Sequence, residues 1–203
     1  MPKQIIFVRH GHTANNSTDH KENRLMGWDD DHVELSEQGK IDAMETAKKL
    51  KSYHIDATYH SDLIRTTETA EIITSQLALT SSPAFGIRER NLGNFANLTM
   101  HEIKTNRPSD WAKFLDHFDP DWNGLGGESL RDMYNRFDSF MHELKAKHRD
   151  QTVLLITHSG FMHTILRDYF NFFPKESFIE VGHSSVTILG KIGDRYQLTS
   201  HNQ

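Results

Sequence analysis

The sequence predicts an α/β fold in which helices cover both faces of a mostly parallel β-sheet. Two short runs, Ile5 to Val8 and Thr152 to Thr157, are apolar or β-branched throughout. A strand of this kind belongs to a sheet buried on both faces, because neither side-chain direction meets water. Segments with helical spacing of apolar residues separate the expected strands. A histidine and then a glycine occur within the three residues that follow each run. This is the strand end where α/β enzymes bind ligands.

The first half of the chain begins with the strand Ile5–Val8 and a long polar loop. A connection of that length in a compact domain is usually functional. Ser36 has the hydroxyl of a helix N-cap, and apolar residues recur at helical spacing after it. The expected elements are a loop at 13–34, a helix from Ser36 to about Ser52, a strand at Ile55–His60, a helix beginning at Ser61-Asp62, and a strand at Pro83–Ile87.

The second half is punctuated by Pro108, which breaks a helix, and by Ser129 with Asp132, which form a capping-box pattern. The apolar run at 152–157 is the clearest strand. Glycines 190 and 193 are expected to join the last two strands. The expected elements are a helix at Met100–Phe118 with a break at Pro108, a helix from Ser129 to about His148, a strand at Thr152–Thr157, a helix at Phe161–Phe170, and strands at Ser184–Leu189 and Tyr196–Thr199.

The composition and length of the chain exclude several classes of function. The chain has 203 residues, a net charge of −5 and no cysteine. The length suits one α/β domain. No basic run suggests a nucleic-acid partner, and no segment has the length of a membrane span. Without cysteine, thiolate catalysis and disulfides are excluded. We expect a cytoplasmic protein, because residues 1–4 lead directly into a strand rather than into a signal peptide.

Fourteen histidines raise the possibility of a metal protein. Their spacing argues against it, because no pair on an expected helix has the separation of metal ligands. The run Asp29-Asp30-Asp31 lacks the alternating ligands and final glutamate of a calcium loop and is interpreted as a solvated turn. We therefore expect no metal and no other cofactor.

Two strand ends carry the candidate chemistry. Arg9-His10-Gly11 follows the first strand, and Thr157-His158-Ser159-Gly160 ends the clearest one. Adjacent parallel strands would bring both imidazoles to one rim of the sheet, which favours a shared site. A neutral histidine beside an arginine suits nucleophilic attack on an anionic phosphoryl group. Gly11 permits a sharp turn and close approach of a ligand. Each histidine alone could equally be a buried structural residue.

The chain resembles the histidine phosphatase superfamily, also called phosphoglycerate-mutase-like. Seven segments carry the resemblance in family order: Val8-Arg9-His10-Gly11-His12-Thr13 with Asn16, Gly27-Trp28-Asp29, Leu35-Ser36-Glu37-Gln38-Gly39, Ser61-Asp62-Leu63-Ile64-Arg65-Thr66 through Ala70, Arg88-Glu89 with Leu92-Gly93, Gly127-Glu128-Ser129, and Thr157-His158-Ser159-Gly160. The resemblance implies a three-layer α/β/α sandwich forming a single domain over residues 1–203, with a small helical cap at about 95–127.

The resemblance also implies the site residues. The catalytic set is His10, Glu89, His158, Arg9 and Arg65, and substrate binding falls to Asn16, Gly11 and Ser159. His10 would form a phosphohistidine that water hydrolyses, the arginines and His158 would stabilise the phosphoryl group, and Glu89 would transfer protons. From local sequence alone, a surface position for Arg65 and an ion pair of Glu89 with Arg88 or Arg90 would be favoured, and Asn16 could equally be a turn residue.

The resulting prediction is a metal-independent phosphomonoesterase acting on a small phosphorylated metabolite, as a monomer or homodimer. The short interval between Glu89 and His158 favours a phosphatase over a phosphoglycerate mutase, since the family's mutases carry a long insertion there. A catalytically silent phospholigand-binding module and a histidine-rich metal protein are the other hypotheses. His12 and Met26 depart from common family residues, which leaves the substrate open.

Aromatic residues outside the motifs have two interpretations each. One set consists of Trp111, Phe114, Phe118 and Trp122. We prefer the interpretation that these residues pack the middle segment onto the domain, rather than line the mouth of the pocket. Core packing and a dimer surface remain open for the other, Tyr169, Phe170, Phe172 and Phe173.

Overall fold

The computed structural model describes every residue except 17–23, 29, 31, 115–118 and 124–125. Within the described chain, six strands form one sheet in the order β3-β2-β4-β1-β5-β6. The first four of these pair in parallel, and the last two are antiparallel. The strands are β1 (Gln4–Arg9), β2 (Ala57–His60), β3 (Ser82–Pro83), β4 (Thr152–Thr157), β5 (Val186–Ile192) and β6 (Arg195–Ser200). This confirms the mostly parallel sheet.

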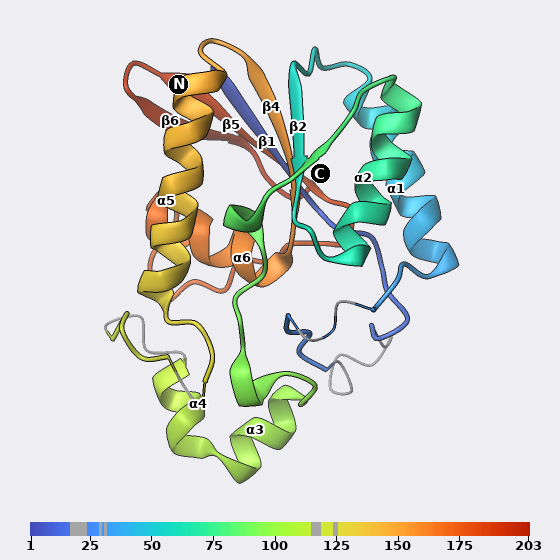
Figure 1. Ribbon diagram of the computed structural model, residues 1–203. Helices are drawn as coiled ribbons and strands as arrows, with labels where there is room; N and C mark the ends of the chain where they lie inside the picture. The colour runs from blue at the N-terminus through green and yellow to red at the C-terminus, as the bar shows by residue number, and fades with distance from the viewer. Residues whose placement is uncertain (17–23, 29, 31, 115–118, 124–125) are drawn as a thin grey trace.

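Helices lie on both sides of the sheet, as Figure 1 shows, and this confirms the three-layer α/β/α arrangement. α1 and α2 pack together on one face, and α5 and α6 lie on the other. The helices are α1 (Glu37–Leu50), α2 (Ile64–Leu77), α3 (Met100–Asn106), α4 (Pro108–Phe114), α5 (Leu130–Lys147) and α6 (Ser159–Thr164), with short 3-10 turns η1 (Phe85–Ile87) and η2 (Gly93–Phe95) and a π-helical turn η3 (Ile165–Tyr169). None of the helices among the described residues is long and apolar enough to cross a bilayer.

β1 divides its side chains between two apolar cores. Ile5 and Phe7 pack in the core beneath α5, and Ile6 and Val8 pack in the core beneath α1 and α2. All four are at most 1% exposed. Burying each such side chain stabilises the fold by roughly 1.5–3 kcal/mol, so the continuous apolar run is explained by a strand covered on both faces.

The two helix starts that were predicted from capping residues, at Ser36 and Ser129, have the expected hydrogen bonds. The Ser36 side chain accepts a hydrogen bond from the backbone N–H of Gly39 at the start of α1. Ser129 and Asp132 form a complete capping box at the start of α5. Each cap satisfies backbone donors that the first helical turn leaves without partners. Both predicted helix starts are therefore confirmed.

The predicted strand at Pro83–Ile87 is wrong beyond its first residue. β3 ends at Pro83, and η1 follows. A Cβ on Gly86 would lie 2.5 Å from the Cβ of Phe140, so the chain leaves the sheet edge here to pack against α5. Tertiary packing of this segment overrides the local preference for a strand.

The predicted helix beginning at Ser61-Asp62 starts three residues later, at Ile64. Ser61 is still extended, because its backbone N–H donates to the carbonyl of Ile156 and continues the pairing of β2 with β4. The predicted helix at Phe161–Phe170 begins earlier instead, since α6 starts at Ser159 and passes into η3 at Ile165.

The last two strands form the expected hairpin with different limits. β5 reaches Ile192, so Gly190 lies inside the strand and only Gly193, with a φ of +58°, lies in the turn. Tyr169, Phe170, Phe172 and Phe173 pack against the core beneath α5, which favours their core interpretation.

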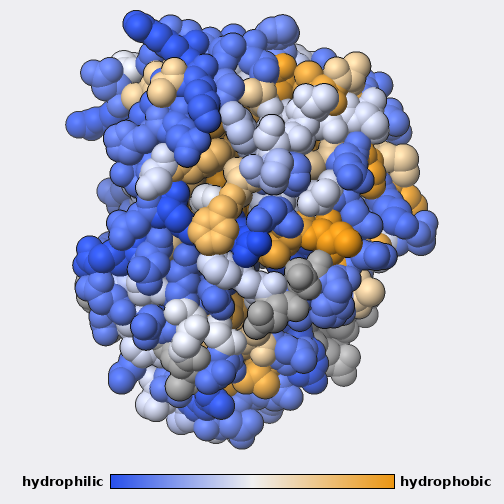
Figure 2. Space-filling view, viewed as in Figure 1, coloured by the Kyte–Doolittle hydropathy of each residue, from blue (hydrophilic) through white to orange (hydrophobic). Residues whose placement is uncertain are grey.

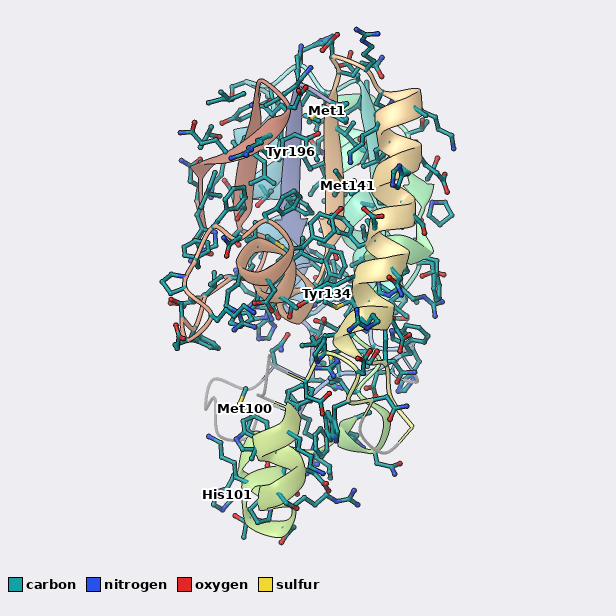
Figure 3. The ribbon with its side chains drawn as sticks, turned by 90° about the vertical axis from the view of Figure 1, so that its left-hand side faces the viewer. Met1, Met100, His101, Tyr134, Met141 and Tyr196 are labelled. Atoms are coloured by element: carbon teal, nitrogen blue, oxygen red, sulfur yellow. The ribbon has the colours of Figure 1, made fainter. Side chains whose placement is uncertain are left out.

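α3 and α4 lie apart from the sheet, beyond the carboxyl ends of its parallel strands (Figures 1 and 3). In Figure 3, Met100 and His101 of α3 are at the opposite end of the molecule from Met1. Phe95, Trp111, Phe114 and Trp122 form a ring cluster here, with centroids 5.4–6.3 Å apart in edge-on, tilted and, for Trp111 with Phe114, stacked contacts. The packing interpretation of these aromatics fits this cluster, while Phe118 lies outside the described residues. A cap at about 95–127 over a single domain stays a prediction.

The surface in Figure 2 is mainly hydrophilic, with apolar side chains gathered at mid-height between the sheet and the layer of α3 and α4. Phe85 of η1 is a large apolar side chain with 51% of its area exposed. The Phe85 ring is contacted by Trp28 and Arg88 and remains half exposed, whereas Gly86 packs closely against α5.

We expect Gly86→Ala to destabilise the protein by about 1–3 kcal/mol, because the added methyl overpacks the contact with Phe140. The midpoint of urea unfolding measures this change. Ser82→Ala, at an exposed position of neighbouring β3, is the matched control and should leave the midpoint unchanged. An equal midpoint for Gly86→Ala and the wild type would contradict the packing of η1 on α5.

Candidate active site

The carboxyl ends of β1 and β4 place the two candidate histidines side by side. Arg9 is paired with Thr157 in the parallel register, and the backbone N–H of His10 donates to the carbonyl of Thr157 over 2.9 Å. The next residue of β4's chain is His158. The ring centroids of His10 and His158 are 5.3 Å apart, in an edge-on arrangement. The structure therefore brings both imidazoles to one rim of the sheet, as the sequence predicts.

His10 is held with one ring nitrogen available. His10 is only 2% exposed, and its Nδ1 atom lies 2.8 Å from the carbonyl oxygen of Gly11. A carbonyl can only accept, so Nδ1 carries the hydrogen and Nε2 keeps its lone pair. Burial, with the positive charges of Arg65 and Arg9, lowers the pKa of His10 well below 6.5. The ring is therefore a neutral base or nucleophile.

Arg9 and Arg65 supply positive charge to the same region. Each uses one terminal nitrogen on a carbonyl: Arg9 donates to Val181 over 2.8 Å and Arg65 to Asp30 over 3.2 Å. The Nε atoms of both, and Nδ1 of His158, are buried without a hydrogen-bond partner among the described residues. Burial lowers the pKa of Arg9 to about 10, which leaves it protonated at neutral pH.

Glu89 interacts electrostatically with both arginines. Its negative charge raises the pKa values of Arg9 and Arg65, while burial lowers them by a larger amount. Its carboxylate accepts hydrogen bonds from the backbone N–H groups of Arg90 over 2.9 Å and Gly160 over 3.0 Å. Burial raises the pKa of Glu89 above 4.5, and the hydrogen bonds oppose that shift only in part. Glu89 is therefore a carboxyl group suited to exchanging a proton.

Gly160 is required for this carboxylate to approach. A Cβ at position 160 would lie 2.8 Å from Oε1 of Glu89, closer than unbonded carbon and oxygen atoms pack. The glycine after His158 and Ser159 therefore leaves room for Glu89 at the first turn of α6.

A buried ion pair lies behind Glu89, and sequence reasoning gave it no role. Arg136 donates to both carboxylate oxygens of Glu128, over 2.6 and 3.0 Å, with both side chains less than 10% exposed. Arg136 and the indole N–H of Trp28 also donate to the backbone carbonyl of Glu89, over 3.1 and 2.7 Å. Trp28 and Glu128 belong to motifs identified in the sequence, which was the available signal. Trp28 binds the backbone that carries Glu89 directly, and Glu128 does so through Arg136.

The three predicted substrate-binding residues are placed differently. The N–H of Gly11 donates to Thr69, and a Cβ on Gly11 would lie 2.6 Å from the carbonyl oxygen of Gly39, so the glycine is explained by close packing of two backbones. The side-chain oxygen of Asn16 accepts two hydrogen bonds from Thr13. Ser159 begins α6. Contact of these three residues with a substrate stays a prediction.

A third histidine, His183, lies at the site and was not predicted. Its ring centroid is 6.3 Å from that of His10 and 5.2 Å from that of His12. Nδ1 of His12 lies 2.8 Å from the hydroxyl of Ser36, the residue that caps α1. No motif identified position 183, because its nearness to His10 depends on the antiparallel pairing of β5 with β1.

The described residues contain no group of three or more histidine, aspartate or glutamate side chains placed to hold a metal ion. Asp29 and Asp31 of the predicted solvated turn lie outside the described residues, and the Asp30 carboxylate accepts a hydrogen bond from Gly27 over 2.7 Å. The arrangement around His10 offers instead two guanidinium groups and an imidazole, which is the chemistry that binds a tetrahedral anion.

The burial of His158 predicts a pH-dependent stability. Its pKa in the folded protein is lowered well below 6.5, chiefly by burial, so below that pH the unfolded chain binds a proton that the folded protein resists. The free energy of unfolding should therefore fall as pH drops below about 6.5. In urea unfolding at about pH 7.5 and about pH 5.5, His158→Gln should lose less stability than the wild type.

The control for this prediction is His54→Gln, because the His54 side chain is 85% exposed. Because this variant keeps the buried His158, it should lose stability at low pH as the wild type does. If His158→Gln also followed the wild type, the folded protein would accept the proton on His158 as readily as the unfolded chain.

Comparisons with known proteins agree with this geometry. Residues 5–203 match the model of the histidine phosphatase superfamily, branch 1. Phosphoglycerate mutase-like protein 4 of Arabidopsis thaliana is 33% identical, with 80% of this chain aligned to 69% of that protein, and phosphoserine phosphatase 1 of Hydrogenobacter thermophilus is 31% identical, with 77% aligned to 71%. A mycobacterial glucosyl-3-phosphoglycerate phosphatase, solved in complex with VO3, superposes with a TM-score of 0.82 at 26% identity, over 98% of this chain and 99% of that one. The chain therefore belongs to branch 1 of the histidine phosphatase superfamily, consistent with a phosphoric monoester hydrolase.

Proposed function

We propose that this protein is a metal-independent phosphomonoesterase that acts through a phosphohistidine at His10 on a small phosphorylated metabolite. One observation carries the proposal. Three buried donors, Nε of Arg9, Nε of Arg65 and Nδ1 of His158, have no partner among the described residues and belong to side chains around His10. Buried donors without partners are costly, and a phosphoryl group has the acceptor oxygens that satisfy them.

In the first step, the Nε2 lone pair of His10 attacks the phosphorus atom. An N–P bond forms, the P–O bond to the leaving group breaks, and the leaving oxygen takes a proton from Glu89. Arg9 and Arg65 stabilise the charge on the phosphoryl oxygens throughout. Phosphoryl transfer needs mainly positioning and electrostatic stabilisation from the protein, which the buried cations supply.

In the second step, Glu89 acts as the base. It accepts a proton from water, whose oxygen attacks phosphorus as the N–P bond breaks and the lone pair returns to Nε2 of His10. The pKa of Glu89, raised by burial, suits a carboxyl group that gives a proton in one step and takes one in the next. Two-step transfer divides one difficult displacement into two easier ones.

A phosphoglycerate mutase is the second candidate function, because one relative is named phosphoglycerate mutase-like and several others are named phosphoglycerate mutases. The relatives named phosphatases support hydrolysis, and so does the short segment between Glu89 and His158. Interconversion of 2- and 3-phosphoglycerate in the presence of a bisphosphorylated primer, faster than release of inorganic phosphate, would select the mutase.

His10→Ala tests the central step. We expect it to abolish hydrolysis of p-nitrophenyl phosphate in excess chelator, a loss of more than about 1000-fold, because the nucleophile is gone. When the reaction is quenched at high pH, the wild type should also carry a phosphoryl group that acid releases. The variant should carry none. His54→Gln, with its exposed side chain, is the matched control for loss of a histidine.

Hydrolysis that survives His10→Ala would remove the mechanism. A wild type that binds inorganic phosphate in calorimetry but never turns over an ester or becomes phosphorylated would favour the silent phospholigand-binding module. Stoichiometric zinc in untagged protein, with activity lost in chelator, would favour the metal-protein hypothesis.

Gly160→Ala tests the position of Glu89. The new Cβ would lie 2.8 Å from Oε1 of Glu89, so the carboxylate must move away from the leaving group. We expect kcat to fall about 10- to 100-fold, with a smaller change in the affinity for inorganic phosphate, because the arginines stay in place. Steady-state kinetics and phosphate inhibition measure the two effects, and an unchanged kcat would contradict the proton-transfer role of Glu89.

A phosphate-release screen over small phosphoesters would define the substrate. Relatives are named for phosphoserine and for glucosyl-3-phosphoglycerate, so amino-acid and sugar phosphates are the first classes to include. Sedimentation of the active protein would decide between the monomer and the homodimer expected from the sequence.

A further inference from the structure

Ser61 lies beside His158 as a consequence of strand register. β2 and β4 pair in parallel with His60 opposite Ile156, and the N–H of Ser61 extends this pairing to the carbonyl of Ile156 over 3.0 Å. The segments that follow β2 and β4 then leave the sheet at the same edge. Ser61 is fully buried, and its hydroxyl oxygen lies 2.8 Å from Nε2 of His158.

The direction of this hydrogen bond follows from the burial of both groups. Among the described residues, His158 is the one partner of the Ser61 hydroxyl. If Nε2 of His158 carried the hydrogen and donated it, two buried groups would lack partners among the described residues, the hydroxyl hydrogen of Ser61 and the lone pair of Nδ1, whereas donation by the hydroxyl leaves only the Nδ1 hydrogen without one. The hydroxyl therefore donates to Nε2, and the ring hydrogen of the neutral imidazole is on Nδ1.

This assignment gives the two histidines opposite roles. His10 has its hydrogen on Nδ1, bound to the Gly11 carbonyl, and exposes a lone pair at Nε2. His158 has a lone pair at Nε2, bound by Ser61, and presents an N–H at Nδ1, which has no partner among the described residues. Burial and the positive charge of Arg65 lower the pKa of His158 and keep the ring neutral. One ring is thus an electron-pair donor and the other a hydrogen-bond donor.

We propose that Ser61 is a positioning residue that holds His158 in the tautomer with hydrogen on Nδ1, so that Nδ1 donates to a phosphoryl oxygen. Ser61 touches no reacting atom and acts through His158. The donation to a phosphoryl group rests on the proposed function, whereas the tautomer itself does not. With the hydrogen on Nε2, the lone pair of Nδ1 would repel the phosphoryl oxygens instead of stabilising them.

A purely structural role for the Ser61 hydroxyl is a separate possibility, and the neighbouring contacts allow the two to be distinguished. The turn after β2 is held by Thr66, whose hydroxyl lies 2.6 Å from the carbonyl oxygens of Ser61 and Leu63. This contact uses the backbone of Ser61 and leaves its side chain for His158. Thr66→Val removes a buried hydroxyl from the same turn without removing the partner of Nε2, which makes it the matched control.

The first experiment needs no change at Ser61. Nitrogen-15 NMR of the imidazoles distinguishes a protonated from an unprotonated ring nitrogen, and the signals of His158 are assigned by their absence from the spectrum of His158→Gln. We expect wild-type His158 to have hydrogen on Nδ1 and none on Nε2 at neutral pH. Hydrogen on Nε2 in the wild type would overturn the proposal, whether or not the protein hydrolyses phosphoesters.

The second experiment compares Ser61→Ala with Ser61→Thr and Thr66→Val. In Ser61→Ala the hydrogen of His158 should move to Nε2 in part of the population, and kcat should fall about 10- to 100-fold, the size found when a group that orients a functional histidine is removed. Inhibition by inorganic phosphate should change less than kcat, because the donated bond strengthens as charge develops in the transition state. Ser61→Thr keeps the hydroxyl and should keep the tautomer.

The outcomes separate the two proposals. Thr66→Val should reduce stability while leaving the His158 spectrum and kcat unchanged. A Ser61→Ala protein with the wild-type His158 spectrum and kcat would overturn the role of Ser61 even with His10 confirmed as the nucleophile. A wild type with hydrogen on Nδ1 and no phosphohistidine would retain the tautomer assignment and reject the proposed function instead.

Discussion

The parallel pairing of β1 with β4 is the constraint on which the site depends. Hydrogen bonds along this pair place Arg9 opposite Thr157, so the residues that follow each strand leave the sheet at the same edge and at the same height. A slip of the register by one residue would exchange the faces of every side chain in β1. Because the strand is buried on both faces, such a slip would put Ile5 and Phe7 into the wrong core, and the apolar layers thereby fix the distance between the imidazoles.

The electrostatics of the site follow from burial. Removing two arginines, a carboxyl group and two histidines from water disfavours their charged forms, and the result differs for each type of side chain. The guanidinium groups of Arg9 and Arg65 have such high ordinary pKa values that they stay charged, while His10 and His158 become neutral. Permanent cations beside neutral imidazoles can attract an anion while each imidazole keeps a ring lone pair, which a cluster of freely titrating groups could not achieve at neutral pH.

Local physics explains which elements could be predicted. Ile5–Val8 and Ser36 reveal a buried strand and a helix start because apolar periodicity and capping depend on near neighbours in sequence. The segment at Pro83–Ile87 was predicted wrongly because its conformation depends on packing against α5, far along the chain. Family motifs supplied Glu89 and Arg65, for which local sequence favoured ordinary surface roles. Contacts between distant segments place His183 at the site and pair Arg136 with Glu128. No pattern within one segment could therefore predict these contacts.

The loop before β5 completes the surroundings of β1. It supplies the Val181 carbonyl to the Arg9 guanidinium, the Ser185 carbonyl to the Arg9 backbone and the Ser184 N–H to the His10 carbonyl. His10 thus lies near the start of the chain, but the groups that hold its strand lie some 170 positions later, as the 172-residue separation of Arg9 and Val181 shows. During synthesis, Arg9 and His10 therefore lack these hydrogen-bond partners until the late loop has emerged and folded.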